Sequence, residues 1–203
     1  YGWERANWFA PEGVEPKDEW SFRRSNYFEH VGNECRRLRE KVGVIDLTPF
    51  TKFEVTGPGA EGWLDSLVAN KVPTKVGRIA LCHALTQRGG IRSEFTITKL
   101  ADHHYYVVSA GAAERYDSDF LQKKLPTDGS VTLRNITGSR GVFVLAGPRA
   151  RDVLAKLTDV PLDNASFPWL TGQVIEAGLA TDVYALRVNF VGALGWELHF
   201  PIE

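Results

Sequence analysis

Two glutamates lie in glycine-flanked segments that are typical of strands, and each could present a carboxylate to a ligand. Glu94 follows Gly89 and Gly90 in GGIRSEFTI, and Glu197 follows Gly195 in VGALGWELHF. A glycine in a strand lets a ligand or another backbone approach closely. A carboxylate beside such a gap can accept hydrogen bonds from a planar ring rich in N–H groups. The alternatives are a solvated strand face for Glu94 and a structural cross-strand pair for Glu197.

Strand alternation indicates which side chains accompany the two carboxylates. Because successive side chains point to opposite faces, Arg92 is expected beside Glu94, and Gly195 and His199 are expected beside Glu197. The five histidines do not have the spacing of a metal site. The sequence GxxxxGK[S/T] does not occur, and we expect no nucleotide- or flavin-binding fold in this segment.

Each glutamate comes after one copy of an internal repeat with an offset of ninety residues. Six residues of the first copy recur identically in the second, with Phe53, Gly57, Pro58, Ala60, Leu64 and Leu67 matching Phe143, Gly147, Pro148, Ala150, Leu154 and Leu157. Each copy predicts a strand, a tight Gly-Pro turn and a helix. Two such half-domains can be related by a pseudo-twofold axis, with a ligand bound where they meet.

The remaining elements predict an α+β fold. Helices are expected over 27–41 and 112–125, a buried strand over 42–47, and further strands in groups between the helices. This order is typical of antiparallel sheets covered by helices on one side. The aromatic opening, with Trp3, Trp8 and Phe9, indicates a packed lead-in rather than a solvated linker.

Composition bounds the function class. The chain has 24 Lys and Arg against 25 Asp and Glu, with both signs interleaved, so we expect no nucleic-acid partner. Its apolar runs are too short to span a membrane, and its two isolated cysteines favour a reducing compartment. We therefore expect an ordinary globular protein in the cytoplasm.

Six ordered segments carry a family resemblance. They are ECRRLREKVGVIDLTPF, FEVTGPGAEGWLDSL, LTQRGGIRSEFTITKL, YYVVSAG, VLAGPRARDVL and RVNFVGALGWELHF. Together they resemble the folate-binding domain of the glycine-cleavage T-protein (aminomethyltransferase) family. They are most similar to the folate-binding half of the flavin-dependent dimethylglycine and sarcosine dehydrogenases. The opening YGWERANWF is similar to the segment where those enzymes pass from their FAD-binding part into their folate-binding part.

The resemblance implies that the chain is a fragment with three parts. Residues 1–25 would lead in from an upstream FAD domain, 26–140 would form the first folate-binding subdomain, and 141–203 would form a truncated second one. The family's C-terminal subdomain would be missing. The fold implied is T-protein-like, with duplicated strand-turn-helix half-domains and tetrahydrofolate in a central channel.

The resemblance also implies site residues. Glu94 matches an aspartate thought to lie by the reactive folate nitrogens, where it could orient the nucleophile, stabilise an iminium cation or take a proton. Glu94 is therefore the catalytic candidate. The cofactor-binding candidates are Glu197, Tyr105, Tyr106, Ser109, Gly195 and Trp196. The last motif matches the family at Phe190, Val191, Gly192, Gly195, Trp196 and Glu197, whereas Ala193 stands where the family has a glutamate. The alternative for both tyrosines is a core position.

The implied activity is capture of a one-carbon unit. A separate FAD domain would oxidise a small N-methyl amine to an iminium, and tetrahydrofolate bound here would take up the one-carbon unit as 5,10-methylenetetrahydrofolate. In a eukaryote the location would be the mitochondrial matrix. Two alternatives stay open: a non-catalytic module similar to the regulatory subunit of pyruvate dehydrogenase phosphatase, and a stand-alone aminomethyltransferase that works with a lipoyl carrier protein.

Overall fold

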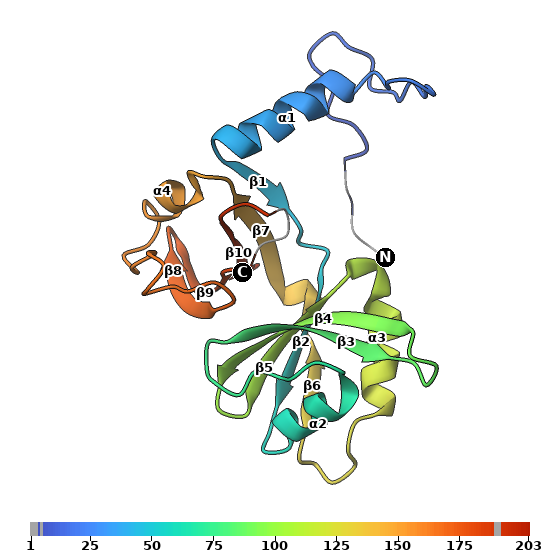
Figure 1. Ribbon diagram of the computed structural model, residues 1–203, viewed down its shortest axis with the longest axis vertical. Helices are drawn as coiled ribbons and strands as arrows, with labels where there is room; N and C mark the ends of the chain where they lie inside the picture. Colours follow the sequence, from blue (N-terminus) through green and yellow to red (C-terminus); the bar gives the residue numbers. More distant parts are fainter. Residues whose placement is uncertain (1–3, 5, 189–191) are drawn as a thin grey trace.

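The computed structural model describes residue 4, residues 6–188 and residues 192–203 of the chain. Their strands form two five-stranded antiparallel sheets (Figure 1). The first sheet has the order β3 (Ile79–Leu85), β4 (Ile91–Ala101), β5 (His104–Ser109), β2 (Thr51–Thr56) and β6 (Thr132–Asn135). The second has the order β1 (Gly43–Asp46), β7 (Arg140–Ala146), β10 (Gly195–Pro201), β9 (Ala180–Leu186) and β8 (Gly172–Ala177). The predicted α+β class with antiparallel sheets is confirmed.

Three of the four helices in the described part of the chain pack on one face of a sheet. The helices are α1 (Phe28–Glu40), α2 (Ala60–Leu67), α3 (Glu114–Lys123) and α4 (Ala150–Leu154). Trp63 of α2 and Leu121 of α3 share a core with Phe53 of the first sheet. Leu154 of α4 shares a second core with Trp196 of the second sheet. The opposite faces of the two sheets meet in a third cluster, here called the seam, which comprises Ile79, Tyr106, Val108, Tyr184 and Leu186.

The ninety-residue repeat is visible in the topology. Strands β2 to β5 with α2 and strands β7 to β10 with α4 follow the same order along the chain and across their sheets. The edge strands are exchanged between the halves. β1 directly precedes β2 but pairs with β7, whereas β6 directly precedes β7 but pairs with β2. The predicted first subdomain, 26–140, therefore does not coincide with one sheet, because residues 43–46 belong to the second sheet.

Matching contacts hold the two crossing connections. The backbone N–H of Lys52 donates to Thr137 Oγ1 at 3.0 Å, and that of Val142 donates to Thr48 Oγ1 at 3.1 Å. The two threonines are themselves oriented by equivalent turns, since the Asp46 and Asn135 side chains each accept a hydrogen bond from the backbone two residues later. Each half-domain is therefore tied to the other through its backbone.

The repeated Gly-Pro turns need glycine. Gly57 has a φ of +113° and Gly147 a φ of +125°, a region that L side chains rarely adopt. A Cβ on Gly147 would lie 2.7 Å from the Lys41 carbonyl oxygen, and one on Gly57 would lie 2.4 Å from that of Ser130. Each glycine therefore lets its turn pass directly over the residues that lead into the exchanged edge strand.

A Gly147→Ala variant is expected to unfold with a free energy about 1 to 3 kcal/mol lower than the wild type, because both φ and the space forbid a Cβ. Gly62→Ala is the matched control. Gly62 lies in α2 with nothing within 4 Å of a built Cβ, so alanine should raise the free energy by up to about 1 kcal/mol. Urea unfolding checks both. Equal midpoints for Gly147→Ala and the wild type would contradict the strain argument.

Residues 57–62, GPGAEG, have the Gly-x-Gly-x-x-Gly spacing between a strand and a helix. In a dinucleotide-binding fold that motif belongs to a parallel βαβ unit. Here β2 is antiparallel to both of its neighbours, β5 and β6. The glycines therefore serve the turn and the strand exchange.

The strand and the helix expected in the N-terminal part both form, but the expected burial of the strand was wrong. The strand predicted over 42–47 forms, but it is an exposed edge strand, with Val44 65% and Ile45 55% exposed. The helix predicted over 27–41 forms as α1, yet it has no buried residue. It extends away from both sheets (Figure 1). Apolar side chains of α1 such as Phe28 and Val31 are therefore exposed.

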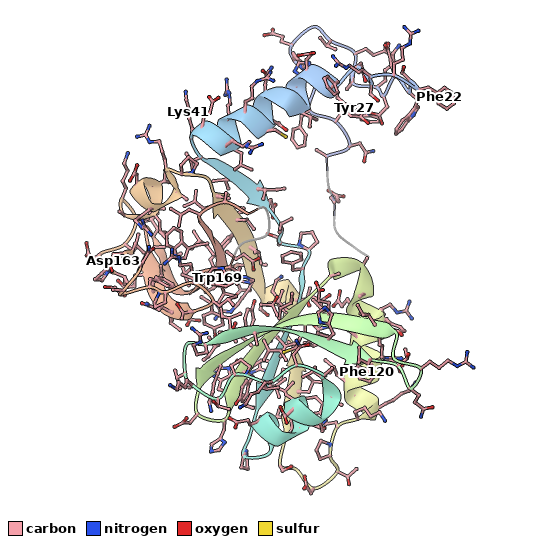
Figure 2. All side chains as sticks on the ribbon, viewed as in Figure 1. Phe22, Tyr27, Lys41, Phe120, Asp163 and Trp169 are labelled. Carbon is pink, nitrogen blue, oxygen red and sulfur yellow. The ribbon has the colours of Figure 1, made fainter. Side chains whose placement is uncertain are left out.

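The lead-in also differs from the expectation of a packed segment. Trp8, Phe9, Trp20 and Phe22 are exposed, and Phe22 projects away from the sheets in Figure 2. Trp3 lies outside the described residues. Over the described part of the chain, no helix is long and apolar enough to cross a membrane.

Candidate functional site

Glu94 lies at the exposed end of the first sheet's seam-side face. The face is defined by cross-strand pairs, in which Glu94 lies opposite His83 and Thr98 lies between Ile79 and Tyr106. Ile79 and Tyr106 belong to the seam, whereas the Glu94 side chain is 60% exposed. Leu81, on the same face, is also exposed. The second sheet therefore covers one end of this face and leaves the Glu94 end open.

A short hydrogen-bonded chain orients Glu94. Glu94 Oε2 lies 2.9 Å from His83 Nε2. Asn70 Oδ1 accepts the backbone N–H of His83 at 3.0 Å and lies 3.3 Å from His83 Nδ1. An amide, an imidazole and a carboxylate are thus aligned on an open surface. This arrangement can exchange a proton with a bound N–H group, because imidazole and carboxylate are the usual general acids and bases.

Arg92 was expected beside Glu94 but lies on the helix side. Its guanidinium carbon is 4.4 Å from the ring centroids of both Tyr116 and Phe120 on α3. The cause is an irregularity in the β3–β4 pairing, where the register shifts between Ala84 and Leu85. A bulge of this kind breaks the alternation on which the expectation rested.

Glu197 is buried and bonded within its own strand. Its Oε2 lies 3.1 Å from Nε2 of His199, which is fully buried. His199 Nδ1 lies 2.8 Å from the hydroxyl of Tyr106 on the first sheet. Burial lowers the pKa of His199, while Glu197 opposes that effect. The predicted strand face was correct in placing Glu197 beside His199, and the structure adds Tyr106.

Tyr105 and Trp196 occupy equivalent core positions. Tyr105 lies opposite Val55, and Trp196 lies opposite Leu145, ninety residues further along the chain. Tyr105 donates its hydroxyl to Glu61 Oε2 at 2.5 Å. Both rings are fully buried on the helix side of their sheets. Stacking of the Tyr105 or Trp196 ring on a folate would require the core to open. Tyr105 therefore occupies a core position, which was the alternative for both tyrosines. Tyr106 lies in the seam.

The remaining predicted positions are Ser109, Gly195 and the last motif, part of which lies outside the described residues. Ser109 lies opposite Thr51 at the end of β5, and alternation puts it on the helix side with Tyr105. A Cβ on Gly195 would lie 2.5 Å from the Leu145 carbonyl oxygen, so this glycine serves close strand packing. Phe190 and Val191 of the last motif lie outside the described residues. Of the predicted residues, Tyr106 and Glu197 are brought together through His199.

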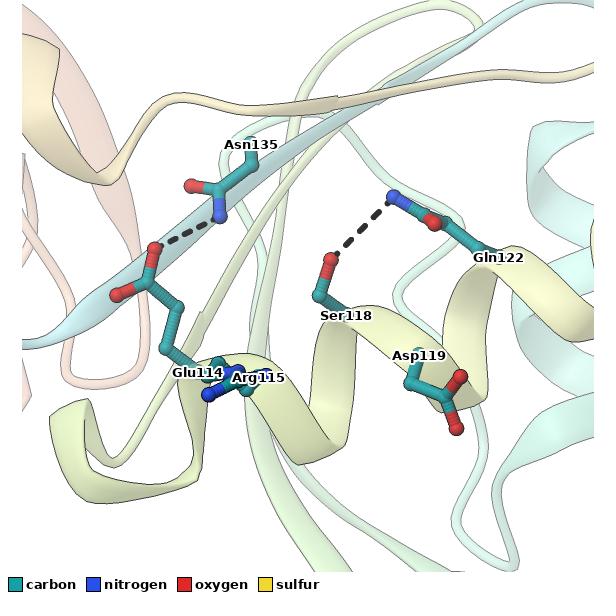
Figure 3. A pocket seen from close by; sticks show the side chains of 6 residues that line it. All are labelled: Glu114, Arg115, Ser118, Asp119, Gln122 and Asn135. Carbon is teal, nitrogen blue, oxygen red and sulfur yellow. Dashed lines mark hydrogen bonds between the residues drawn. The ribbon is translucent and has the colours of Figure 1, made fainter.

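Two hollows lie elsewhere, beside α3. One of about 340 Å³ is lined by Glu114, Arg115, Ser118, Asp119, Gln122 and Asn135 (Figure 3). The other, of about 640 Å³, lies between the β3–β4 turn and α3 and is lined by Leu85, Thr86, Gln87, Arg88, Arg92, Asp119, Phe120, Lys123 and Lys124. Neither is lined by a predicted site residue. The candidate site is therefore the open end of the sheet together with the adjoining seam.

The comparison with protein families gives one match over the entire chain. The model described as the GCVT N-terminal domain covers residues 1–203. The chain belongs to the GCVT N-terminal domain family. Rat mitochondrial dimethylglycine dehydrogenase is 37% identical over all 203 residues, which span 24% of that relative. The mouse mitochondrial pyruvate dehydrogenase phosphatase regulatory subunit is 30% identical over 208 aligned positions and is likewise covered over 24% of its length.

A solved structure supports the GCVT fold. The glycine cleavage system aminomethyltransferase T from Bartonella henselae matches with a TM-score of 0.72 and 23% identity, over 84% of this chain and 45% of that one. The predicted T-protein-like fold is confirmed, and the chain forms part of it. This GCVT chain spans about a quarter of the two relatives named above.

Sequence reasoning did not find His83 and Asn70. A signal was available for His83, because a hairpin centred on the QRGG turn brings residues 83 and 94 opposite each other. Asn70 follows α2, and its contact with β3 depends on how the loop after that helix returns to the sheet. Nothing in the strand pattern marks such a return.

Proposed function

We propose that this GCVT domain is the folate-binding, one-carbon-transfer part of an FAD-dependent protein similar to dimethylglycine and sarcosine dehydrogenases. The observation that carries the proposal is the 37% identity to dimethylglycine dehydrogenase over all 203 residues of this chain, which span 24% of that relative. FAD would be bound by another part of the polypeptide, and the substrate would be a small N-methyl amine. The relatives' names support a mitochondrial location in a eukaryote, which we propose to be the matrix. For a bacterium we propose the cytoplasm.

The residues present fit a folate. A pterin ring offers several N–H groups, which need acceptors, and Glu94 and Glu197 provide carboxylates on faces that turn toward the seam. Glu94 is exposed to a ligand, whereas Glu197 is held by His199. Tetrahydrofolate, when bound, supplies the nitrogen nucleophiles that take up a one-carbon unit.

In this proposal the chain's own residues handle protons. Glu94 accepts a hydrogen bond from a reacting N–H group and takes its proton, and His83, 2.9 Å away, shares that proton. Asn70 fixes the ring of His83. Glu197 would accept a second hydrogen bond from the folate ring and so orient it. The negative charge of Glu94 also stabilises a cationic one-carbon unit beside it.

Glu94→Gln in the full-length protein is expected to slow folate-dependent one-carbon transfer about a hundredfold, because the amide cannot take a proton. Folate affinity should fall less, since the amide keeps one acceptor. Glu176→Gln, an exposed residue on β8, is the matched control and should leave both quantities unchanged. Single-turnover transfer and calorimetric titration with tetrahydrofolate measure the two effects. Equal transfer rates for Glu94→Gln and the control would refute the role of Glu94.

The 30% identity to the phosphatase regulatory subunit favours a second candidate, a non-catalytic regulatory module. Flavin content, N-methyl amine oxidation and tetrahydrofolate binding of the full-length protein separate the two. A full-length protein with no flavin, no oxidation of N-methyl amines and no tetrahydrofolate binding would support the module. A stand-alone aminomethyltransferase would instead transfer an aminomethyl group from a lipoyl carrier protein without flavin.

A further inference from the structure

The seam contains a hydrogen-bonded chain that joins the two half-domains through His199. The Tyr106 hydroxyl lies 2.8 Å from Nδ1, and Glu197 Oε2 lies 3.1 Å from Nε2. His199 is fully buried, and Tyr106 and Glu197 are 1% and 7% exposed. The three side chains come from β5 and β10, strands of different sheets.

Donor and acceptor rules fix the direction of this chain. An ionised carboxylate only accepts, so the proton on the imidazole belongs on Nε2, facing Glu197. The neutral ring then accepts at Nδ1, and the Tyr106 hydroxyl donates. Burial favours this state, because it lowers the pKa of His199 and raises that of Tyr106. Each polar atom has one role: Tyr106 donates to His199, and His199 donates to Glu197.

Two nearby cations act in the same sense as burial, whereas the Glu197 carboxylate raises the pKa of His199. Lys52 on β2 and Arg140 on β7 both lower the pKa of His199. Arg140 is itself fixed, since it donates to the backbone oxygens of Asp182 and His199 and pairs with the Asp182 carboxylate. The Tyr184 ring packs edge-on against Tyr106, with centroids 5.1 Å apart. These contacts leave the imidazole little freedom to rotate.

The repeat explains why Tyr106 and Glu197, the two ends of the hydrogen-bonded chain, lie close together. Tyr106 lies opposite Glu54 on β2, and Glu197 lies opposite Val144 on β7, ninety residues later. Tyr106 and Glu197 thus occupy equivalent positions in the two half-domains, and both face the seam. One copy presents a donor, the other an acceptor, and His199 connects them.

We propose that Tyr106 and His199 are positioning residues, which hold the Glu197 carboxylate in a single orientation toward the folate ring. This inference rests on the proposed function. In it the seam does more than join the halves, because the first half-domain sets the geometry of an acceptor carried by the second. Around metal sites, outer partners that orient a ligand typically change affinity by tenfold or more when removed, and we expect an effect of the same order for an oriented carboxylate.

The test uses full-length holoprotein and tetrahydrofolate titrations of Tyr106→Phe, Glu197→Gln and the double variant. Tyr106→Phe removes one hydroxyl and is expected to weaken folate binding about tenfold. In the Glu197→Gln background the same change should cost less than twofold, because the orientation of the carboxylate is already lost. His199→Gln, which keeps a donor toward Glu197, should bind more tightly than His199→Ala.

Trp63→Phe is the matched control, since it removes a partly buried hydrogen bond, from Trp63 Nε1 to the Lys124 carbonyl, on the opposite side of the sheet. It should leave folate affinity unchanged. If folded Tyr106→Phe binds folate as tightly as the wild type, or if its effect persists undiminished beside Glu197→Gln, the positioning role is refuted. A wild-type protein that does not bind folate would instead refute the proposed function. If Tyr106→Phe does not fold, the two His199 variants decide the question in the same way.

Discussion

A Trp196→Ala variant is expected to lose about 3 to 5 kcal/mol of its free energy of unfolding. Trp196 is fully buried in the core of the second half-domain. Its ring meets that of Phe167 edge-on at 6.0 Å, and the Arg187 guanidinium lies 5.5 Å from its centroid. Alanine would leave a cavity under β10, the strand that carries Glu197. Urea unfolding followed by circular dichroism measures the loss.

Trp196→Phe is the informative companion, because Trp196 is also a predicted cofactor-binding residue. In the described part of the chain its Nε1 has no hydrogen-bond partner, so phenylalanine removes volume but breaks no hydrogen bond. A core role predicts that Trp196→Phe keeps wild-type affinity for tetrahydrofolate while losing less stability than Trp196→Ala. A loss below about 1 kcal/mol for Trp196→Ala would contradict the core position.

The local elements could be predicted from the sequence because their signals are local. FEVTGPGA and VFVLAGPRA each form a strand, a glycine turn and a helix, and the QRGG turn joins β3 to β4. Strand alternation also placed Glu197 and His199 on one face. These features depend on backbone geometry over a few residues, and the sequence determines that geometry directly.

Partner choice could not be predicted, because alternation defines the faces of a strand but not its neighbours. Nothing local tells β1 to pair with β7, almost a hundred residues away, rather than with β2. The hydrogen bonds that join Tyr106 to Glu197 through His199 also connect residues far apart in the sequence, and they form only when the two sheets pack together. Arg92 illustrates a smaller failure, in which a single register shift moved its side chain to the opposite face.

The exchanged connections also place a buried lysine where they cross. Lys52 Nζ donates to the carbonyl oxygens of Thr48, Thr137 and Arg140, at 2.8, 2.9 and 2.7 Å. Thr48 belongs to the connection before β2, Thr137 belongs to the connection before β7, and Arg140 is the first residue of β7. The side chain is fully buried, and this burial lowers its pKa from 10.5 to about 8. The ammonium form of Lys52 is therefore less stable in the folded protein than in water.

This lysine makes stability depend on pH in a direction that can be tested. Below about pH 8, Lys52 is protonated in both the folded and the unfolded state. From about pH 8 to 10.5 the unfolded chain keeps the proton, whereas the folded protein has released it. The free energy of unfolding therefore rises with pH over this interval. Relative to Lys52→Met, the wild type should gain up to about 3 kcal/mol over this interval.

The comparison with Lys52→Met is necessary because other groups act in the opposite sense. Tyr105 and Tyr106 have raised pKa values, so they reduce stability as the pH rises above 10. Both proteins share these tyrosines, and the difference between their free energies of unfolding therefore isolates Lys52. Urea unfolding of both proteins at intervals from pH 7 to 10.5 gives that difference. A difference that stays constant would mean that the ammonium is no harder to bury than to solvate, and that its three carbonyl partners compensate fully for lost hydration.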